Sequence, residues 1–174
     1  MRRGMVWALT VSGALLLGSV AMASTAQSEA ADTDQERDPV FVQWLVADDP
    51  DDETIREYWN CAKRGELDAE GYVDLGTMLF HRGWPQDAIR MFKTALDMDK
   101  RQYEAWFRIG LVHHRAMDYE DARWAYRKCL KLLSGHGWCN FYLGLLEEQT
   151  HHPSKALEHY QRAFKAAPEL ANPA

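Results

Sequence analysis

An internal repeat constrains the fold more than any other feature of this sequence. Residues 69–102, 103–136 and 137–170 align without a gap, and each copy is 34 residues long. A repeat of roughly 20–50 residues builds one small unit of secondary structure several times. A single unit cannot bury its apolar side chains, whereas stacked copies bury them against one another. The sequence therefore predicts a stack of similar units.

The same residue types recur at the same places in each copy. An apolar residue precedes a glycine at Leu75-Gly76, Ile109-Gly110 and Leu143-Gly144. An alanine, an aromatic residue and a second small residue follow at fixed distances: Ala88, Phe92 and Ala95, then Ala122, Tyr126 and Cys129, then Ala156, Tyr160 and Ala163. An aromatic residue precedes the glycine at Tyr72 and Trp106, but the third copy has Asn140 there. Small residues let helices approach closely, and aromatic residues fill the remaining space.

This pattern resembles the tetratricopeptide repeat, and the resemblance covers residues 69–170. It implies an all-α fold, a right-handed α-solenoid of about three helix pairs. Tyr58 and Cys61 extend the phase upstream, so residues 53–68 are expected to form an N-terminal capping helix. The resemblance also implies a protein that binds other proteins and is not an enzyme. Residues 171–174 are expected to form a short tail.

The first 23 residues have the composition of a secretory signal peptide. Arg2 and Arg3 precede an uncharged apolar run at 5–22, and Ala21-Met22-Ala23 precedes Ser24 as a small-x-small cleavage site. We expect cleavage after Ala23 and a periplasmic location for the rest of the chain. The alternative is an uncleaved signal anchor, because the apolar run is near the lower length limit for spanning a bilayer.

Residues 24–52 differ in charge from the repeats. Residues 24–68 carry 13 acidic and 4 basic side chains, within a chain whose formal net charge is −6. Residues 24–52 are expected to form an acidic, largely disordered tether. An apolar segment interrupts it at 39–46. This segment is either the first helix of the capping pair or a ligand for a groove of its own or of a neighbouring molecule.

The resemblance implies a groove lined by the first helix of each repeat. The expected lining residues are Glu70, Val73, Thr77 and Phe80, then Glu104, Phe107, Leu111 and His114, then Trp138, Phe141, Leu145 and Glu148. Most of them are apolar, although half-exposed helix positions are usually polar. The sequence therefore favours binding of an apolar or amphipathic protein segment. In the alternative interpretation, some of these residues belong to the core.

A second interface is predicted at the C-terminal end of the repeats. Helical arrays of this kind usually finish with an extra helix that covers the last apolar face. Only residues 171–174 follow the third repeat, so Leu157, Tyr160 and Phe164 are expected to be open for a homodimer or another partner. Alternatively, Leu157 and Phe164 pack back onto the second repeat.

The sequence contains no motif for catalysis, for a cofactor or for a metal ion. Lys and Arg are scattered without a stacking platform of aromatic residues, which argues against nucleic acid as a partner. Cys129 and Cys139 flank one predicted turn, and either form a disulfide or act as small apolar core residues. The favoured function is a periplasmic adaptor, scaffold or chaperone-like helper. The alternative is a permanent subunit of a larger envelope or periplasmic enzyme complex.

Overall fold

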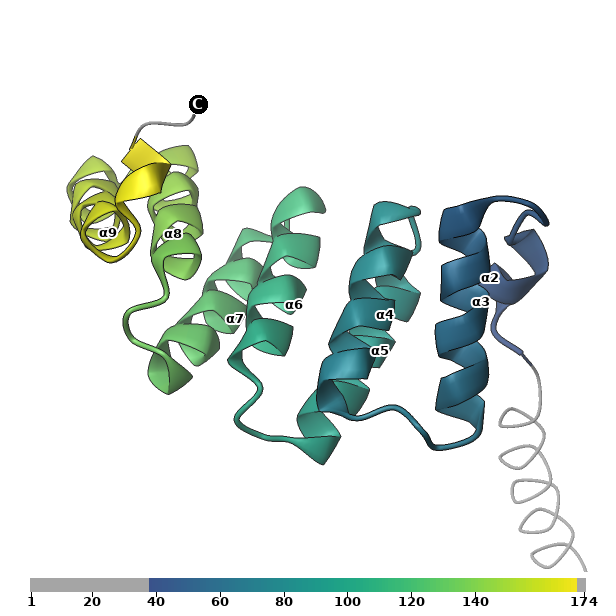
Figure 1. The fold of residues 1–174 in the computed structure, drawn as a ribbon. Coiled ribbons are helices and arrows are strands. Elements are labelled where there is room, and N and C mark those ends of the chain that lie inside the picture. The colour runs from purple at the N-terminus through teal and green to yellow at the C-terminus, as the bar shows by residue number, and fades with distance from the viewer. Residues whose placement is uncertain (1–37, 172–174) are drawn as a thin grey trace, which may run out of the picture. The chain divides into compact units, whose positions relative to one another are not determined.

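Helices form most of the part of the chain that the structure, a computed structural model, describes, which is residues 38–171 (Figure 1). No strand occurs within these residues. The elements are α2 (Val40–Trp44), α3 (Pro50–Lys63), α4 (Ala69–His81), α5 (Pro85–Met98), α6 (Tyr103–Arg115), α7 (Tyr119–Leu132), α8 (Gly137–Gln149), α9 (Pro153–Ala166) and the short 3₁₀ helix η1 (Pro168–Ala171). The expected signal peptide at 1–23 and residues 24–37 of the expected tether lie outside this range. Among the described helices, none is long and apolar enough to cross a membrane.

The helix bounds repeat with the period of the sequence. The first helices α4, α6 and α8 begin at residues 69, 103 and 137, and the second helices α5, α7 and α9 begin at 85, 119 and 153. The turn within each pair contains a residue with a left-handed backbone at the same place: Gly83 (φ 88°), Met117 (φ 65°) and His151 (φ 62°). Glycine adopts this conformation without strain, but methionine and histidine do not. The turn geometry is therefore conserved between the copies even where glycine is absent.

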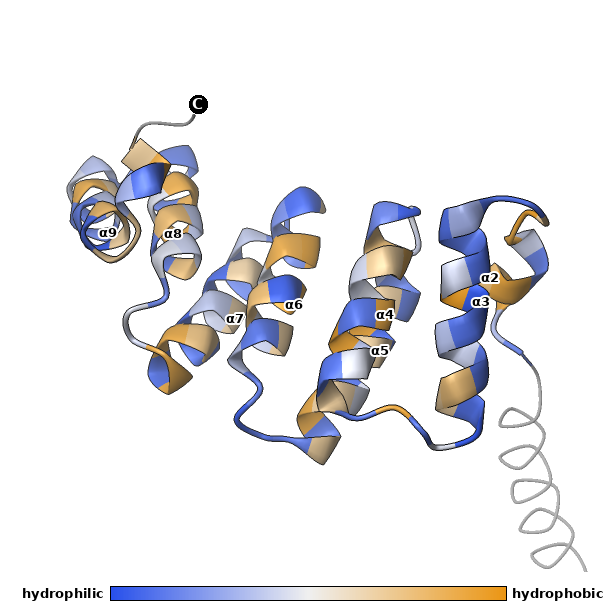
Figure 2. Ribbon diagram, viewed as in Figure 1, coloured by the Kyte–Doolittle hydropathy of each residue, from blue (hydrophilic) through white to orange (hydrophobic). Residues whose placement is uncertain are grey.

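The three helix pairs pack in sequence as an α-solenoid (Figure 1). Each pair is an antiparallel hairpin, and its second helix also contacts the first helix of the next pair. Apolar and polar residues alternate along the helices (Figure 2), so each helix has one face that it can bury. A Cβ atom on Gly76 would lie 2.6 Å from the Phe92 ring, and one on Gly144 would lie 2.7 Å from the Tyr160 ring.

The N-terminal cap is larger than the sequence predicted. Helix α3 begins at Pro50 rather than at residue 53, because Pro50 suits the first turn of a helix and the Asp49 carboxylate accepts hydrogen bonds from the amides of residues 51 and 52. The apolar segment forms α2. Its Phe41 side chain is fully buried and makes an edge-to-face contact with Trp59 of α3, at 5.6 Å between ring centroids. The segment therefore packs on α3 as a short helix, as the first of the two interpretations expects.

Charged side chains fix the cap to the first repeat. Arg82, directly after α4, contacts the carboxylates of Asp49 at 2.5 Å and Asp52 at 2.7 Å. Asp52 is buried and also accepts a hydrogen bond from the backbone N–H of Val46 at 2.8 Å. The hydrogen bond from Arg82 lowers the pKa of Asp49 below its ordinary value. These contacts hold the start of α3 and the chain after α2 against the end of α4.

We predict that Gly110→Ala destabilises the fold, because the added methyl group would overlap the Tyr126 ring between α6 and α7. Overpacking of this kind costs about 1–3 kcal/mol in the free energy of unfolding. Gly135→Ala is the matched control, since a Cβ there has nothing within 4 Å. Urea unfolding of both variants measures the difference. Equal free energies for the two variants would contradict the close approach of these helices.

Candidate functional site

The predicted groove residues lie on α4, α6 and α8, but they differ in exposure. Val73 and Phe107 are buried, with 5% and 6% of their surface exposed, and belong to the core. Val73 also accepts a hydrogen bond through its carbonyl from the Thr77 hydroxyl at 2.8 Å. The same position is half-buried in the third repeat, at Phe141. The groove interpretation therefore does not hold for Val73 and Phe107, which pack between helices.

The remaining predicted apolar residues are open to solvent in part. Trp138 is exposed over 47% of its surface. Four others are half-buried: Phe80, Leu111, Phe141 and Leu145. Trp138 and Phe141 are in edge-to-face contact, with ring centroids 6.1 Å apart. The guanidinium carbon of Arg115 also lies over the Phe80 ring, 5.4 Å from the ring centroid. The open apolar surface is thus concentrated at the first turns of α8, with Phe80 and Leu111 as further members.

Tyr142 connects these side chains to the core, and sequence reasoning missed it. Its ring lies 6.2 Å from Trp138, 5.9 Å from Phe107 and 5.8 Å from His114, and it stacks on Tyr126 at 6.0 Å. The first two repeats have Asp74 and Arg108 at this position. An aromatic residue in place of a charged one is a departure from the repeat that could have identified Tyr142.

His114 lies on the same surface as a neutral side chain. Its Nε2 is 3.0 Å from the Gln149 side-chain oxygen, and its Nδ1 is 3.4 Å from the Tyr126 hydroxyl. Burial lowers the pKa of His114 below its ordinary value, although the hydrogen bond with Gln149 opposes this shift. Burial also raises the pKa of Tyr126. Neither group is charged near neutral pH, so this part of the surface suits an uncharged contact.

The predicted second interface is open at one of its three residues. Leu157 is exposed over 59% of its surface. Tyr160 and Phe164 are half-buried, and their rings stack at 6.1 Å. The Tyr160 hydroxyl donates to Glu148 at 2.8 Å, and burial together with this carboxylate raises the pKa of Tyr160 to about 12. Of the three residues, Leu157 is therefore the one whose side chain is mainly exposed.

The two predicted cysteines meet between α7 and α8. Cys129 and Cys139 form a disulfide, and both are fully buried. The sequence left two interpretations open, and the structure agrees with the disulfide. His136 caps α8 beside them, since its Nδ1 accepts a hydrogen bond from the Cys139 amide at 3.0 Å. The ligand atoms of Cys129, His136 and Cys139 all lie within 4.8 Å of one another, which the sequence spacing did not reveal.

The comparisons with known proteins agree with the helix pairs described above. Residues 73–135 match the sequence profile of the tetratricopeptide repeat. The match covers the first two helix pairs in part and leaves out the third. Among curated proteins, no match to the chain was found.

Solved structures of tetratricopeptide proteins share the fold. The crystal structure of MamA has a TM-score of 0.60 and 23% sequence identity, over 71% of this chain and 77% of MamA. YrrB, described as a tetratricopeptide protein with an unusual peptide-binding site, has a TM-score of 0.59 and 19% identity, over 68% of this chain and 61% of YrrB. The second tetratricopeptide domain of Spaghetti, bound to an HSP90 peptide, has a TM-score of 0.55 and 14% identity, over 60% of this chain and 97% of that domain.

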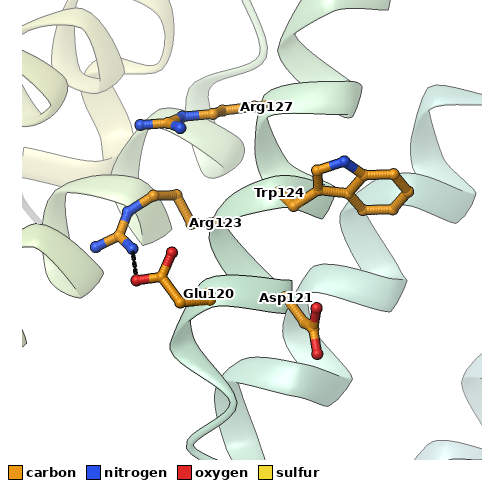
Figure 3. Close-up of a pocket in the computed structure, with 5 residues that line it drawn as sticks. All are labelled: Glu120, Asp121, Arg123, Trp124 and Arg127. Atoms are coloured by element: carbon orange, nitrogen blue, oxygen red, sulfur yellow. Dashed lines mark hydrogen bonds and ion pairs between the residues drawn. The ribbon is translucent and has the colours of Figure 1, made fainter.

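A cleft of about 480 Å³ lies on α7, in the second repeat, and the sequence did not predict it. Arg123 and Arg127 extend to one side of the helix and Trp124 to the other (Figure 3). Trp124 is exposed over 52% of its surface, and the Lys128 ammonium group lies 5.0 Å from the centre of its ring. The cleft carries charges of both signs, because Glu120 pairs with Arg123 and Asp121 lies nearby. It therefore has no preference for one sign of charge.

Arg123 also joins the second repeat to the third. Its Nε donates to the Glu147 carboxylate at 2.9 Å, and both side chains are almost completely buried. A second contact runs from Arg123 to the Thr150 hydroxyl at 3.3 Å. Burial opposes the ionisation of Glu147, but the hydrogen bond and the charge of Arg123 outweigh it and lower the pKa of Glu147. The two repeats are thus held by a buried ion pair as well as by apolar packing.

We predict that Glu147→Gln lowers the free energy of unfolding at pH 7 by about 2 kcal/mol, because it removes a charged hydrogen bond and leaves Arg123 partly uncompensated. The folded pKa of Glu147 is lowered, so its contribution is present above the unfolded pKa and is lost as the pH falls. The difference between variant and native protein should therefore shrink below about pH 4. Urea unfolding across this range measures it.

The control for this prediction is Glu158→Gln. Glu158 pairs with Arg162 within α9, and both side chains are more than half exposed. Its removal should change stability by less than about 0.5 kcal/mol at any pH. A similar loss in both variants would contradict the role of the buried pair.

Proposed function

We propose that this protein is a non-catalytic interaction module that binds an apolar or amphipathic segment of a partner protein. The binding surface is built on α4, α6 and α8. The exposed indole of Trp138, beside Phe141 and Tyr142, carries the proposal. Large aromatic side chains that remain exposed on a rigid helix lose little conformational entropy on binding, and Trp is enriched among the residues that dominate interface energies.

The neutral character of this surface favours side-chain contacts over recognition of a charged chain end. His114 is neutral near pH 7, and Glu104 is paired with Arg108 at 2.9 Å. Val73, Thr77, Phe107 and Leu111 occupy the places where a carboxylate clamp would need Lys and Asn. The Spaghetti domain and YrrB support the general role, because one is bound to a peptide and the other is described as having a peptide-binding site.

The alternative function is a permanent accessory subunit of a larger complex. It is favoured by Leu157, which is exposed over 59% of its surface on α9, away from the first helices of the repeats. Such a subunit would co-purify with its complex at fixed stoichiometry. A homodimer through the same residue is a further version of this alternative.

The test compares two exposed tryptophans. C-terminally tagged protein is used to capture partners from an extract of its own cells, and the affinity of each purified partner is then measured by calorimetry. Trp138→Ala should weaken binding by about 30-fold, as expected for a residue that contributes about 2 kcal/mol. Trp124→Ala on α7 removes a similar exposed indole outside the proposed surface and should leave the affinity unchanged.

Two results would contradict this assignment. Equal affinities for native protein and Trp138→Ala would remove the surface on α8 from the interface. Loss of binding in Leu157→Asp, with Trp138→Ala unaffected, would favour the accessory subunit. Circular dichroism of each variant shows whether its helices are intact, so a folding defect is not mistaken for a binding defect.

We further propose that the protein acts in the periplasm. The support is the basic start, the apolar run at 5–22 and the Ala21-Met22-Ala23 sequence. Protein recovered from a periplasmic fraction should have a mass that corresponds to a first residue of Ser24. An intact N-terminus in the membrane fraction would favour the signal anchor, and recovery from the cytoplasm would contradict export.

A further inference from the structure

Two cysteines and a histidine converge where the second repeat meets the third. Cys129 lies in the last turn of α7, Cys139 in the first turn of α8, and His136 at the cap of α8. Their Sγ and ring nitrogen atoms lie within 4.8 Å of one another. Sulfur and imidazole nitrogen ligands around tetrahedral zinc are about 3.5–3.8 Å apart, as follows from Zn–S bonds of about 2.3 Å and Zn–N bonds of about 2.0 Å. All three atoms are thus near enough for one ion to reach them, once the S–S bond is broken and the sulfurs have moved apart.

We propose that the reduced form of this protein binds one Zn²⁺ ion through Cys129, Cys139 and His136, and that the disulfide is the metal-free form of the same site. Thiolate and imidazole ligands are the set that selects zinc over harder cations. The pattern His136-Gly137-Trp138-Cys139 places two of the ligands on one helical turn.

The histidine already has the tautomer that a metal requires. Its Nδ1 accepts the Cys139 amide hydrogen at 3.0 Å, so Nδ1 is unprotonated; in this proposal its lone pair passes from the cap hydrogen bond to the metal ion when the ion binds. Its Nε2 then carries the proton and lies 3.7 Å from the Glu104 carboxylate. A carboxylate behind a histidine is the usual arrangement at zinc sites, where it fixes the ring and raises its basicity. Glu104 is therefore a positioning residue in this proposal.

The metal site forms in two steps: a donor reduces the disulfide, and the two thiols then bind the ion. A dithiol donor transfers two electrons and two protons to the Cys129–Cys139 disulfide; the S–S bond breaks, two thiols form and the donor becomes a disulfide. Zn²⁺ then binds both sulfurs as thiolates and releases the two protons.

The three protein ligands leave one coordination position for another group. His136 is partly open to solvent, so water can reach this position, whereas both sulfurs are buried. Three protein ligands with one open position are typical of zinc sites that exchange a water or a substrate. The described residues provide no fourth His, Cys, Asp or Glu within the cluster.

The experiment uses Co²⁺ as a spectroscopic probe for the zinc site. The purified protein is reduced with a phosphine, freed of the reductant without air and titrated with Co²⁺. We expect one Co²⁺ per chain, a thiolate-to-cobalt charge-transfer band and its loss when Zn²⁺ is added. Oxidised protein should give no band. Absence of the band in the reduced protein, or its presence in the oxidised protein, would overturn the proposal.

The key variant is His136→Asn. Asparagine keeps a side-chain acceptor at the cap of α8, so the helix start is preserved while the imidazole is lost. The affinity for Co²⁺ should fall by more than about 100-fold, and Glu104→Gln should lower it by about 10–100-fold while the charge-transfer band is retained. Unchanged affinity in His136→Asn would overturn the assignment of the third ligand.

Matched controls separate this site from the other thiol and histidines. Cys61→Ser removes the free cysteine, and His113→Asn removes a histidine of α6 outside the cluster. Both variants should bind Co²⁺ as the native protein does. Loss of the band in Cys61→Ser, or its persistence in a Cys129→Ser, Cys139→Ser double variant, would contradict the proposal.

Discussion

The contact between a glycine and an aromatic ring determines how closely the two helices of each repeat approach, and the remaining contacts depend on this distance. Phe92, Tyr126 and Tyr160 lie over Gly76, Gly110 and Gly144, where a methyl group would overlap the ring. Two of the small residues that follow these rings, Ala95 and Cys129, are fully buried, and Cys129 is bonded to Cys139 of the next repeat. The same contact recurs in each copy, and the helix bounds recur with it.

The sequence was sufficient for this frame because local chemistry repeats at a fixed spacing. It predicted an all-α solenoid of helix pairs, and the fold agrees with this prediction. The sequence was less informative about residues whose contacts do not follow the repeat. Phe41 is fully buried although it lies in a short apolar stretch among acidic residues, and its partner Trp59 carries no signal of the contact. Tyr142 and His136 gain their roles from neighbours on other helices, which spacing alone does not bring together.

The joint between the second and third repeats differs in chemistry from the joint between the first and second. Leu96, Ala105 and Ile109 join the first pair of repeats through apolar contacts. The next joint adds the buried pair Arg123–Glu147 and the disulfide. A buried ion pair is a weak source of stability but is costly to break, so it favours one arrangement of the two helices over others. This arrangement fixes the position of α8, which carries the most exposed aromatic side chain of the first helices.

Both proposals involve residues in the first turn of α8. Trp138 lies between His136 and Cys139 in the sequence, so its backbone belongs to the turn that would hold a metal ion. Its indole nevertheless points to solvent and contacts Phe141 and Tyr142, not the cysteines. The core side of the turn is therefore tied to α7 through Cys129 and Cys139, and its solvent side presents the indole. Metal binding at Cys139 would therefore involve the same backbone turn that positions Trp138. The proposed metal site and the proposed partner surface thus share one helical turn of α8.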